Sequence, residues 1–195
     1  MPGNHYDLIV IGSGPGGATL AQRLARTGKK ILILERGDWL ERSPDNWNPR
    51  KVFIDNAYQA QETWYDKTGK AFHPGLHYFV GGNSKMYGAA LFRLRERDFE
   101  TIQHAGGFSP EWPLKYDVFA PWYDEAEKLF HVRGAAGEDP TEPPRSGPYA
   151  YPPVAHEPRL QQLSETFTRA GLHPFHMPLG ILWDEVDGRT TRSSP

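Results

Sequence analysis

A glycine-rich segment directly after the first apolar run constrains the fold of this chain more than any other feature. Residues 7–11 are apolar and rich in β-branched side chains, a pattern that predicts a strand buried on both faces. The glycines that follow have the spacing G-x-G-x-x-G, at Gly12, Gly14 and Gly17. Residues 18–27 favour a helix, and a second apolar run at residues 31–34 predicts another strand, which ends in Glu35. The sequence therefore predicts a strand–turn–helix–strand unit, the opening of an α/β fold.

Each glycine of this motif has a steric role in dinucleotide-binding folds. Gly12 permits the tight turn after the strand, Gly14 lets the backbone approach a pyrophosphate, and Gly17 lets the helix pack closely on the strand. The N-terminus of the helix offers free N–H groups and the positive end of its dipole to phosphates. Glu35 follows at the usual distance of about 20 residues, where a carboxylate accepts hydrogen bonds from a ribose diol and disfavours a 2′-phosphate. The motif predicts dinucleotide binding, disfavours an NADP-type adenosine and does not choose between NAD and FAD.

A second glycine-containing stretch follows a turn expected at residues 67–70. Residues 76–80 predict a short strand, Gly81 and Gly82 predict a turn, and the small residues after them favour the start of a helix. Paired glycines let the backbone lie close to a flat ligand or a pyrophosphate. The next two residues can cap the following helix, and that role alone would account for Asn83 and Ser84.

Composition and charge disfavour several classes of function. The net charge is −2, so nothing favours nucleic acid or an anionic membrane as a partner. No long apolar run occurs and residues 1–6 lack a basic segment, so neither a membrane span nor a cleaved signal peptide is expected. The sequence has no cysteine, which excludes disulfides and thiol chemistry within it and favours a cytoplasmic location. No metal site is expected, because an H-E-x-x-H motif is also absent.

Charged residues and a helical pattern follow in the middle of the chain. The first charged group is expected to form a solvated face of Arg93, Arg95, Glu96 and Arg97. A short helix is expected from Arg97 to the glycine pair at residues 106–107, and a later helix has Pro121 in its first turn. The apolar face of that later helix would be Trp122, Ala126, Leu129 and Phe130. Its solvated side would be Tyr123, Asp124, Glu125 and Glu127.

The C-terminal part of the sequence begins with residues 134–158, where proline and glycine predict a linker or a long surface excursion. Apolar residues then recur at helical spacing, at Leu160, Leu163, Phe167 and Ala170. Residues 173–183 predict one or two strands, residues 187–188 a turn, and residues 189–195 a disordered tail. The expected division is a nucleotide-binding domain, a linker and the start of a substrate-side region, at residues 1–132, 133–158 and 159–195.

The sequence resembles a known family, the glucose–methanol–choline (GMC) flavoprotein oxidoreductases. The first shared motif is the glycine motif with Glu35, and the second is Val80–Ser84 followed by Tyr87-Gly88. The third comprises Glu111–Asp117 and Pro121–Glu127. It is similar to a Trp-Pro … Tyr-Tyr-Asp-x-Ala-Glu segment in the branch near pyranose oxidases and gluconate or fructose dehydrogenases. The first motif is generic, whereas the three in this order are specific to the family.

The resemblance implies an α/β fold: a Rossmann-like FAD/NAD(P)-binding domain, doubly wound but incomplete, with the beginning of a substrate-binding α+β region. It implies that the FAD pyrophosphate lies on Gly12, Ser13, Gly14, Gly16 and Gly17. Glu35, followed by Arg36, would hold the adenosine ribose. The flavin side of the cofactor would lie along Gly81, Gly82, Asn83 and Ser84. The residues near the isoalloxazine would be Tyr87, Gly88 and Ala89.

Two positions depart from the family pattern. Pyranose-oxidase relatives carry a histidine that bonds covalently to the flavin, and Met86 stands at the matching position. A thioether cannot form that bond, so the implied FAD is non-covalent. Tyr87 replaces an asparagine that many members carry, so the family's flavin contact does not carry over at this position.

The activity that the resemblance implies is oxidation of an alcohol or sugar at a CH–OH group, with hydride transfer to the flavin. In relatives a His–His or His–Asn pair takes the hydroxyl proton, because imidazole titrates near neutral pH. That pair lies far toward the C-terminus of the relatives, and none of the eight histidines here matches it. The chain is therefore interpreted as the N-terminal part of such an enzyme. No catalytic residue is expected in it, and alone it would bind FAD weakly without turnover.

Three alternatives stay open from the sequence. Another flavoprotein with two dinucleotide-binding folds, such as an amine oxidase or an aromatic hydroxylase, would share the first motif but usually lacks Gly81–Ser84 and Trp112-Pro113 in this order. A truncated, catalytically inactive nucleotide-binding protein would also fit. An NAD-dependent dehydrogenase would leave the Gly81-Gly82 segment without a role.

Overall fold

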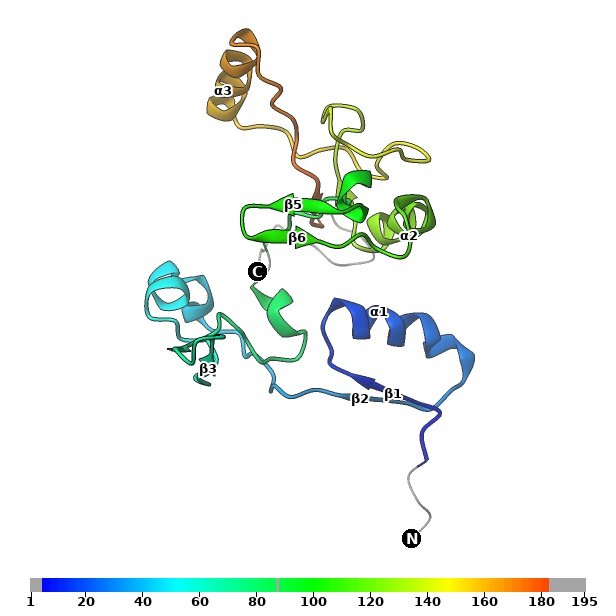
Figure 1. Cartoon of the computed structure of the whole chain (residues 1–195), viewed down its shortest axis with the longest axis vertical. Coiled ribbons are helices and arrows are strands. Elements are labelled where there is room, and N and C mark those ends of the chain that lie inside the picture. Colours follow the sequence, from blue (N-terminus) through cyan, green and yellow to red (C-terminus); the bar gives the residue numbers. More distant parts are fainter. Residues whose placement is uncertain (1–4, 87, 183–195) are drawn as a thin grey trace. The chain divides into compact units, whose positions relative to one another are not determined.

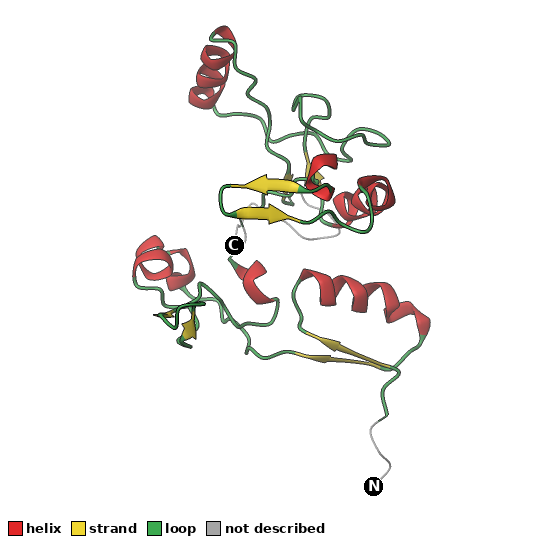
Figure 2. Ribbon diagram, in the orientation of Figure 1, coloured by secondary structure: helices red, strands yellow, loops and turns green. Residues whose placement is uncertain are grey.

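The structure is a computed structural model that describes residues 5–86 and 88–182 (Figure 1). The chain divides into two compact units, Met1–Tyr87 and Gly88–Pro195, and both contain helices and strands (Figure 2). The turn and the tail expected beyond residue 186 lie outside the described residues.

The first unit opens with strand β1 (Leu8–Ile11), helix α1 (Pro15–Leu24) and strand β2 (Ile31–Leu34). A one-turn 3₁₀ helix, Ala25–Thr27, extends α1. The two strands pair in parallel along their whole length. Parallel neighbours need a crossover connection, which α1 supplies. The α/β fold with a strand–helix–strand start is therefore confirmed.

Helix α1 begins at Pro15, before the start that the sequence pattern indicated. Proline suits the first helical position, because the N–H that it lacks would have no partner there. Gly17 lets the helix lie close to β1. A Cβ at Gly17 would overlap the carbonyl oxygen of Gly12 and would lie 3.0 Å from Cγ1 of Val10. This is the close helix–strand packing that the third glycine of the motif predicts.

The expectation that the first strand is buried on both faces is wrong. Val10 is 6% exposed, but Ile9 is 54% and Ile11 is 87% exposed. Successive side chains of a strand point to opposite faces, so Val10 faces α1 while its two neighbours face away from the helix. Within the described residues β1 pairs with β2 alone. Helix α1 can cover only one face of this two-stranded sheet.

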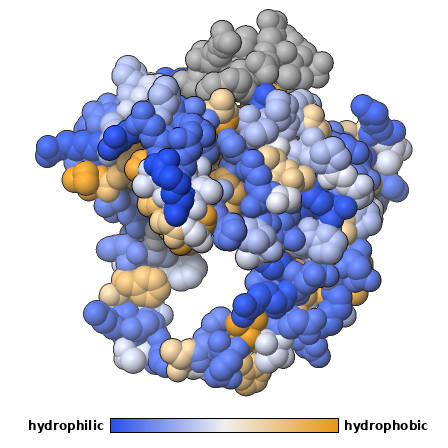
Figure 3. Space-filling view, turned by 90° about the horizontal axis from the view of Figure 1, so that it is seen from above, coloured by the Kyte–Doolittle hydropathy of each residue, from blue (hydrophilic) through white to orange (hydrophobic). Residues whose placement is uncertain are grey.

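The segment after β2 has little regular structure. Its elements are the 3₁₀ helix Pro44–Trp47, the π-helix Arg50–Ile54 and the antiparallel strands β3 (Trp64–Tyr65) and β4 (Ala71–Phe72). The turn expected at residues 67–70 is confirmed, because Oδ1 of Asp66 accepts the N–H groups of Thr68 and Lys70 at 2.8 and 3.0 Å. Large hydrophobic side chains are exposed in both units, and the face shown in Figure 3 carries orange, hydrophobic atoms among blue, hydrophilic ones.

The chain then returns to the end of β2. Asp38 and Phe79 form a parallel bridge. Gly37 makes this approach possible, because a Cβ there would overlap the backbone of Tyr78. The strand expected at residues 76–80 is wrong in extent. It is reduced to this isolated bridge, because β2 has already ended where the returning backbone meets it.

Residues 88–182, the described part of the second unit, contain two strand pairs and two α-helices. Its elements are the 3₁₀ helix Glu96–Phe99, strands β5 (Ile102–His104) and β6 (Gly107–Ser109), helix α2 (Tyr116–Leu129), strand β7 (Val132–Arg133), helix α3 (Pro158–Arg169) and strand β8 (Leu179–Gly180). Both pairs, β5–β6 and β7–β8, are antiparallel. The helix expected from Arg97 to residues 106–107 is wrong, because it ends at Phe99 and a hairpin follows. Glycine favours the hairpin turn over a helix interior.

An aromatic cluster forms the core of this unit around Phe99, which is 1% exposed. Its ring stacks on Phe119 with the centroids 5.3 Å apart. Trp112 and Tyr116 meet it edge-on at 5.8 and 6.2 Å. Stacked and edge-on pairs at these distances are the favourable geometries for aromatic rings. The cluster joins the hairpin segment to α2.

Helix α2 turns inward the face that carries Asp124 and Glu127. Trp122 is 63% exposed, whereas Glu127 is 7% exposed. Pro121 lies inside the helix rather than in its first turn. The first-turn position expected for Pro121 is therefore wrong. The solvated position expected for Glu127 is also wrong, because Glu127 pairs with the buried guanidinium of Arg93, a partner far away in sequence, whereas Glu125 is exposed as expected.

Helix α3 confirms the helix that the apolar spacing predicts. Its apolar side chains are nevertheless exposed, with Leu160 at 52%, Leu163 at 38% and Phe167 at 47%. Figure 1 shows α3 standing apart from the other elements of its unit. Strand β8 lies within the region where one or two strands are expected.

The packing of α1 on β1 predicts opposite effects for two neighbouring glycines. Gly17→Ala places a methyl group against backbone, and we expect it to lower the free energy of unfolding by roughly 1–3 kcal/mol. Gly16→Ala meets nothing within 4 Å, and we expect it to raise the free energy of unfolding by a few tenths up to about 1 kcal/mol. Urea unfolding followed by circular dichroism measures both. Equal midpoints for the two variants would contradict the close packing at Gly17.

Candidate nucleotide-binding site

The loop between β1 and α1 presents the N-terminus of the helix. Gly14 is the N-cap residue, no side chain caps the helix, and no acidic residue lies in its first turn. The first N–H groups of a helix have no intrahelical partner, so those of Gly16 and Gly17 point out of the helix end. The positive end of the helix dipole lies at the same place. This helix end therefore fits phosphate groups.

Glu35 lies at the end of β2 beside this loop. Its Oε2 accepts hydrogen bonds from the backbone N–H of Ser13 at 2.9 Å and from the hydroxyl of Ser13 at 2.5 Å. Its Oε1 accepts the N–H of Gly37 at 2.9 Å. The hydrogen bond from Gly37, followed by those from Ser13, lowers the pKa of Glu35 to about 2. The side chain is therefore a carboxylate at neutral pH, and Oε1 keeps capacity to accept from a ribose diol.

The diglycine turn, Gly81-Gly82, lies against the same loop. The N–H of Gly81 donates to the hydroxyl oxygen of Ser13 at 2.8 Å. A Cβ on Gly14 would lie 3.9 Å from the carbonyl oxygen of Gly81, and one on Gly82 would lie 3.8 Å from Cα of Gly14. The φ angles of Gly81 and Gly82 are 100° and 64°, a region that other residues rarely adopt. The first unit thus brings both glycine segments and Glu35 together.

Asn83 and Ser84 hold the diglycine turn but do not cap a helix, so the capping expectation is wrong. Both lie inside the 3₁₀ helix Gly82–Lys85, which has no side-chain cap because its N-cap residue is a glycine. Oδ1 of Asn83 accepts the N–H of His77 at 2.7 Å. The hydroxyl of Ser84 donates to the carbonyl oxygen of Gly81.

Arg36 contacts residues that the sequence patterns do not single out. Its guanidinium pairs with Glu62 and lies 3.9 Å from the ring centre of Tyr78. The hydroxyl of Tyr78 and the indole N–H of Trp64 both donate to Oε1 of Glu62. These hydrogen bonds, from Tyr78 first, then Trp64 and Arg36, lower the pKa of Glu62 to about 2. The charge of Arg36 is therefore balanced by Glu62 within the unit.

Sequence reasoning missed three residues that shape this site. Gly37 follows Glu35 and Arg36 directly, and its lack of a side chain could have indicated a close backbone approach. Glu62 and Tyr78 offered no signal, because the segments that carry them have no clean period and their contacts span long stretches of sequence.

The residues expected near the isoalloxazine stay a prediction. Tyr87 lies outside the described residues. Gly88 and Ala89 belong to the second unit, where the carbonyl oxygen of Ala89 accepts the N–H of Gly180 at 2.9 Å. Met86 follows the diglycine turn in the first unit, and its N–H donates to the carbonyl oxygen of Asn83 at 3.0 Å.

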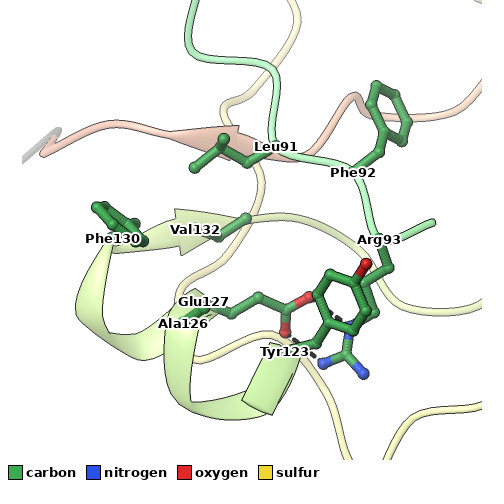
Figure 4. A pocket seen from close by; sticks show the side chains of 8 residues that line it. All are labelled: Leu91, Phe92, Arg93, Tyr123, Ala126, Glu127, Phe130 and Val132. Carbon is green, nitrogen blue, oxygen red and sulfur yellow. Dashed lines mark hydrogen bonds and ion pairs between the residues drawn. The ribbon is translucent and has the colours of Figure 1, made fainter. Parts of the chain in front are cut away.

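The expectation that Arg93 lies on a solvated face is wrong, because Arg93 belongs to a buried ion-pair network in the second unit. Arg93 is 3% exposed, and its Nε and Nη2 donate to the two carboxylate oxygens of Glu127, both at 2.7 Å (Figure 4). Burial lowers the pKa of Arg93, but the hydrogen bonds to Glu127, Tyr116 and Asp124 outweigh it and raise the pKa above its usual value. Arg145, in the long loop between β7 and α3, also donates to Glu127, at 2.7 Å. The network therefore ties that loop to α2.

A pocket of about 170 Å³ lies beside this network (Figure 4). It is lined by Leu91, Phe92, Arg93, Tyr123, Ala126, Glu127, Phe130 and Val132. The two charged residues in its wall, Arg93 and Glu127, are already bonded to each other. The pocket therefore offers mainly apolar contacts.

Among residues 5–86 and 88–182, no group of three or more His, Asp or Glu side chains is arranged to hold a metal ion. No helix in these ranges has the length and apolarity needed to cross a bilayer.

The comparisons with known proteins agree with this geometry. A family model described as an NAD(P)-binding Rossmann-like domain matches residues 10–40, which cover the end of β1 and all of α1 and β2. An FAD-dependent oxidoreductase structure from Chaetomium thermophilum matches with a TM-score of 0.53 at 18% identity, over 91% of this chain and 34% of that one. The first unit therefore starts with a Rossmann-like nucleotide-binding fold.

Two curated relatives extend the likeness to nearly the whole sequence. The chain is 35% identical to paromamine 6′-oxidase of Streptomyces fradiae, over 95% of this chain and 32% of the relative. It is 32% identical to 2-methyl-1,2-propanediol dehydrogenase of Mycolicibacterium austroafricanum, over 94% of this chain and 34% of the relative. The chain spans about a third of the length of these relatives. It is similar to the N-terminal region of GMC-type oxidoreductases, and the resemblance that its motifs indicate is confirmed.

The hydrogen bonds around Glu35 predict a pH dependence of stability. Its pKa falls from 4.5 to about 2, so its stabilising effect is fully present above pH 4.5 and is lost as the pH falls toward 2. We expect the wild type to be more stable than Glu35→Gln at pH 7, and the difference to shrink below pH 4.5. Urea unfolding at a series of pH values measures it, with Glu41→Gln as a control for loss of an exposed carboxylate. A difference that stays constant from pH 7 to pH 3 would contradict this role.

Proposed function

We propose that this chain is the FAD-binding N-terminal part of an oxidoreductase that acts on CH–OH groups of alcohols or sugars. The observation that carries the proposal is the meeting of the helix N-terminus, Glu35 and the diglycine turn in one unit. The relatives support the class of reaction, since one is an oxidase of paromamine and another a dehydrogenase of a diol.

The residues present fit FAD. The α1 N-terminus with Gly16 and Gly17 would bind the pyrophosphate, and Glu35 would accept hydrogen bonds from the adenosine ribose. The glycines at positions 14 and 82 leave room that a Cβ on either would take up. Gly81–Ser84 would then lie along the flavin side, with Tyr87, Gly88 and Ala89 near the isoalloxazine. Residues 1–132 would form the FAD-binding domain, residues 133–158 a linker and residues 159–195 the start of the substrate-side region.

The chain's own part in the reaction is binding and orientation. FAD, when bound, supplies the acceptor for the hydride that leaves the alcohol carbon. Glu35 would fix the adenosine ribose and the helix end the pyrophosphate, because the carboxylate of Glu35 is held in place before binding. The residue that takes the hydroxyl proton is not assigned to this chain. The 195 residues alone are therefore proposed to bind FAD weakly and not to turn over. A cytoplasmic location is also part of the proposal, supported by the absence of cysteine.

Substitution of Glu35 tests the adenosine end of the site. We expect the 195-residue protein to bind FAD more tightly than NADP⁺, because the carboxylate repels a 2′-phosphate. Glu35→Gln should weaken FAD binding about tenfold, since hydrogen bonds to a charged acceptor are lost. Glu41→Gln should leave the affinity unchanged. Isothermal titration calorimetry measures all of these affinities, and equal affinities for wild type and Glu35→Gln would refute the assignment.

A separate experiment tests whether FAD is bound covalently and whether the 195-residue protein oxidises alcohols or sugars. Because Met86 cannot bond to flavin, all FAD should stay in the supernatant after acid precipitation of the loaded protein. Dye reduction with alcohols and sugars should show no turnover by the 195-residue protein. Flavin in the pellet would refute non-covalent binding, and steady turnover would show that a proton-accepting residue lies within this chain. Tight binding of NAD⁺ in place of FAD would favour a dehydrogenase instead.

A further inference from the structure

The hydroxyl of Ser13 occupies the centre of the candidate site. It donates to Oε2 of Glu35 at 2.5 Å and accepts the N–H of Gly81 at 2.8 Å. Both directions are set by the partners, because an ionised carboxylate can only accept and a backbone N–H can only donate. The hydroxyl has one proton, and Glu35 receives it.

This hydroxyl connects segments that are distant in the sequence. Ser13 and Glu35 are 22 positions apart, and Ser13 and Gly81 are 68 positions apart. The loop after β1, the end of β2 and the diglycine turn therefore meet at one oxygen atom. The turn is also held from its other side by the hydroxyl of Ser84, which donates to the carbonyl oxygen of Gly81.

Both donors of Ser13 are engaged within the protein. The hydroxyl proton and the backbone N–H point to the same Oε2 atom of Glu35. A phosphate needs hydrogen-bond donors, and Ser13 has none to offer while these bonds exist. The N–H groups at the start of α1 are the donors available for that purpose.

We propose that Ser13 is a positioning residue, which holds the diglycine turn in place relative to Glu35 rather than binding the pyrophosphate. One hydroxyl would then set the spacing between the adenosine end and the flavin-side end of the cofactor site. This inference rests on the proposed FAD function and deepens it. Ser13 acts through Gly81 and Glu35.

The positioning role of Ser13 predicts that its substitution weakens FAD binding more than ADP binding. ADP reaches Glu35 and the helix end, whereas FAD also extends to the diglycine turn. Ser13→Ala removes the acceptor for Gly81 N–H, so FAD binding should weaken about tenfold while ADP binding weakens by about threefold at most. Ser13→Thr keeps a hydroxyl and should retain both affinities.

The experiment uses the complete 195-residue chain as wild type, Ser13→Ala, Ser13→Thr and Ser43→Ala. Ser43 donates to Asn46 at 3.2 Å and is a matched control outside the site. Calorimetry measures the FAD and ADP affinities. Hydrogen exchange followed by NMR measures the Gly81 amide without ligand, where Ser13→Ala should speed exchange about tenfold and leave the amides of β1 and β2 unchanged.

Several results would overturn the proposal. Equal losses of FAD and ADP affinity in Ser13→Ala would place Ser13 at the pyrophosphate. An unchanged exchange rate at Gly81 would show that the hydroxyl does not hold the turn. If Ser13→Ala changes the far-ultraviolet circular dichroism, Ser13→Cys replaces it, because a thiol is a weak donor and acceptor. If the wild type binds no FAD, the proposed function fails for this chain, while the exchange measurement still decides whether Ser13 holds the turn.

Discussion

The close contact between α1 and β1 at Gly17 is the constraint on which the first unit depends. A methyl group there would overlap the carbonyl oxygen of Gly12, so a larger residue would push the helix away from the strand. With the helix in contact, its N-terminus lies at the carboxyl end of β1. The carboxyl end of β2 lies beside it, because the two strands are parallel and in register. Open parallel sheets bind ligands at this edge, because the carboxyl ends of the strands and the N-termini of the helices meet there.

Carboxylates join the remaining segments in both units. Glu35 links β2 to the loop after β1, and Glu62 links Arg36 to Tyr78 in the segment that returns to the end of β2. Glu127 does the same for Arg93 and Arg145 in the second unit. An ionised carboxylate accepts several hydrogen bonds at once, and each is stronger than a bond between neutral groups. These acids therefore organise long loops that have few regular hydrogen bonds of their own.

The predictable parts of the fold are those with a local pattern. Strands β1 and β2, helix α1 and helix α3 follow from apolar periodicity within short windows. The failures have a common cause. The inward face of α2 depends on Arg93, and the short bridge at Phe79 depends on Gly37 and Asp38, so neither can be read from neighbouring residues. The face of β1 away from α1 was also mispredicted, because burial depends on what covers a strand and not on the strand's own composition.

The sequence by itself determined the strand–helix–strand unit, the steric need for Gly17 and the acid at the end of the second strand, because each follows from local backbone geometry and spacing. It also indicated that Gly81 and Gly82 form a turn where the backbone can lie close to a ligand. The tertiary structure alone decided that this segment meets Ser13, that Arg36 pairs with Glu62, and that Glu127 is buried. Those outcomes depend on hydrogen bonds between residues far apart in the chain, and their partners are chosen when the whole unit folds.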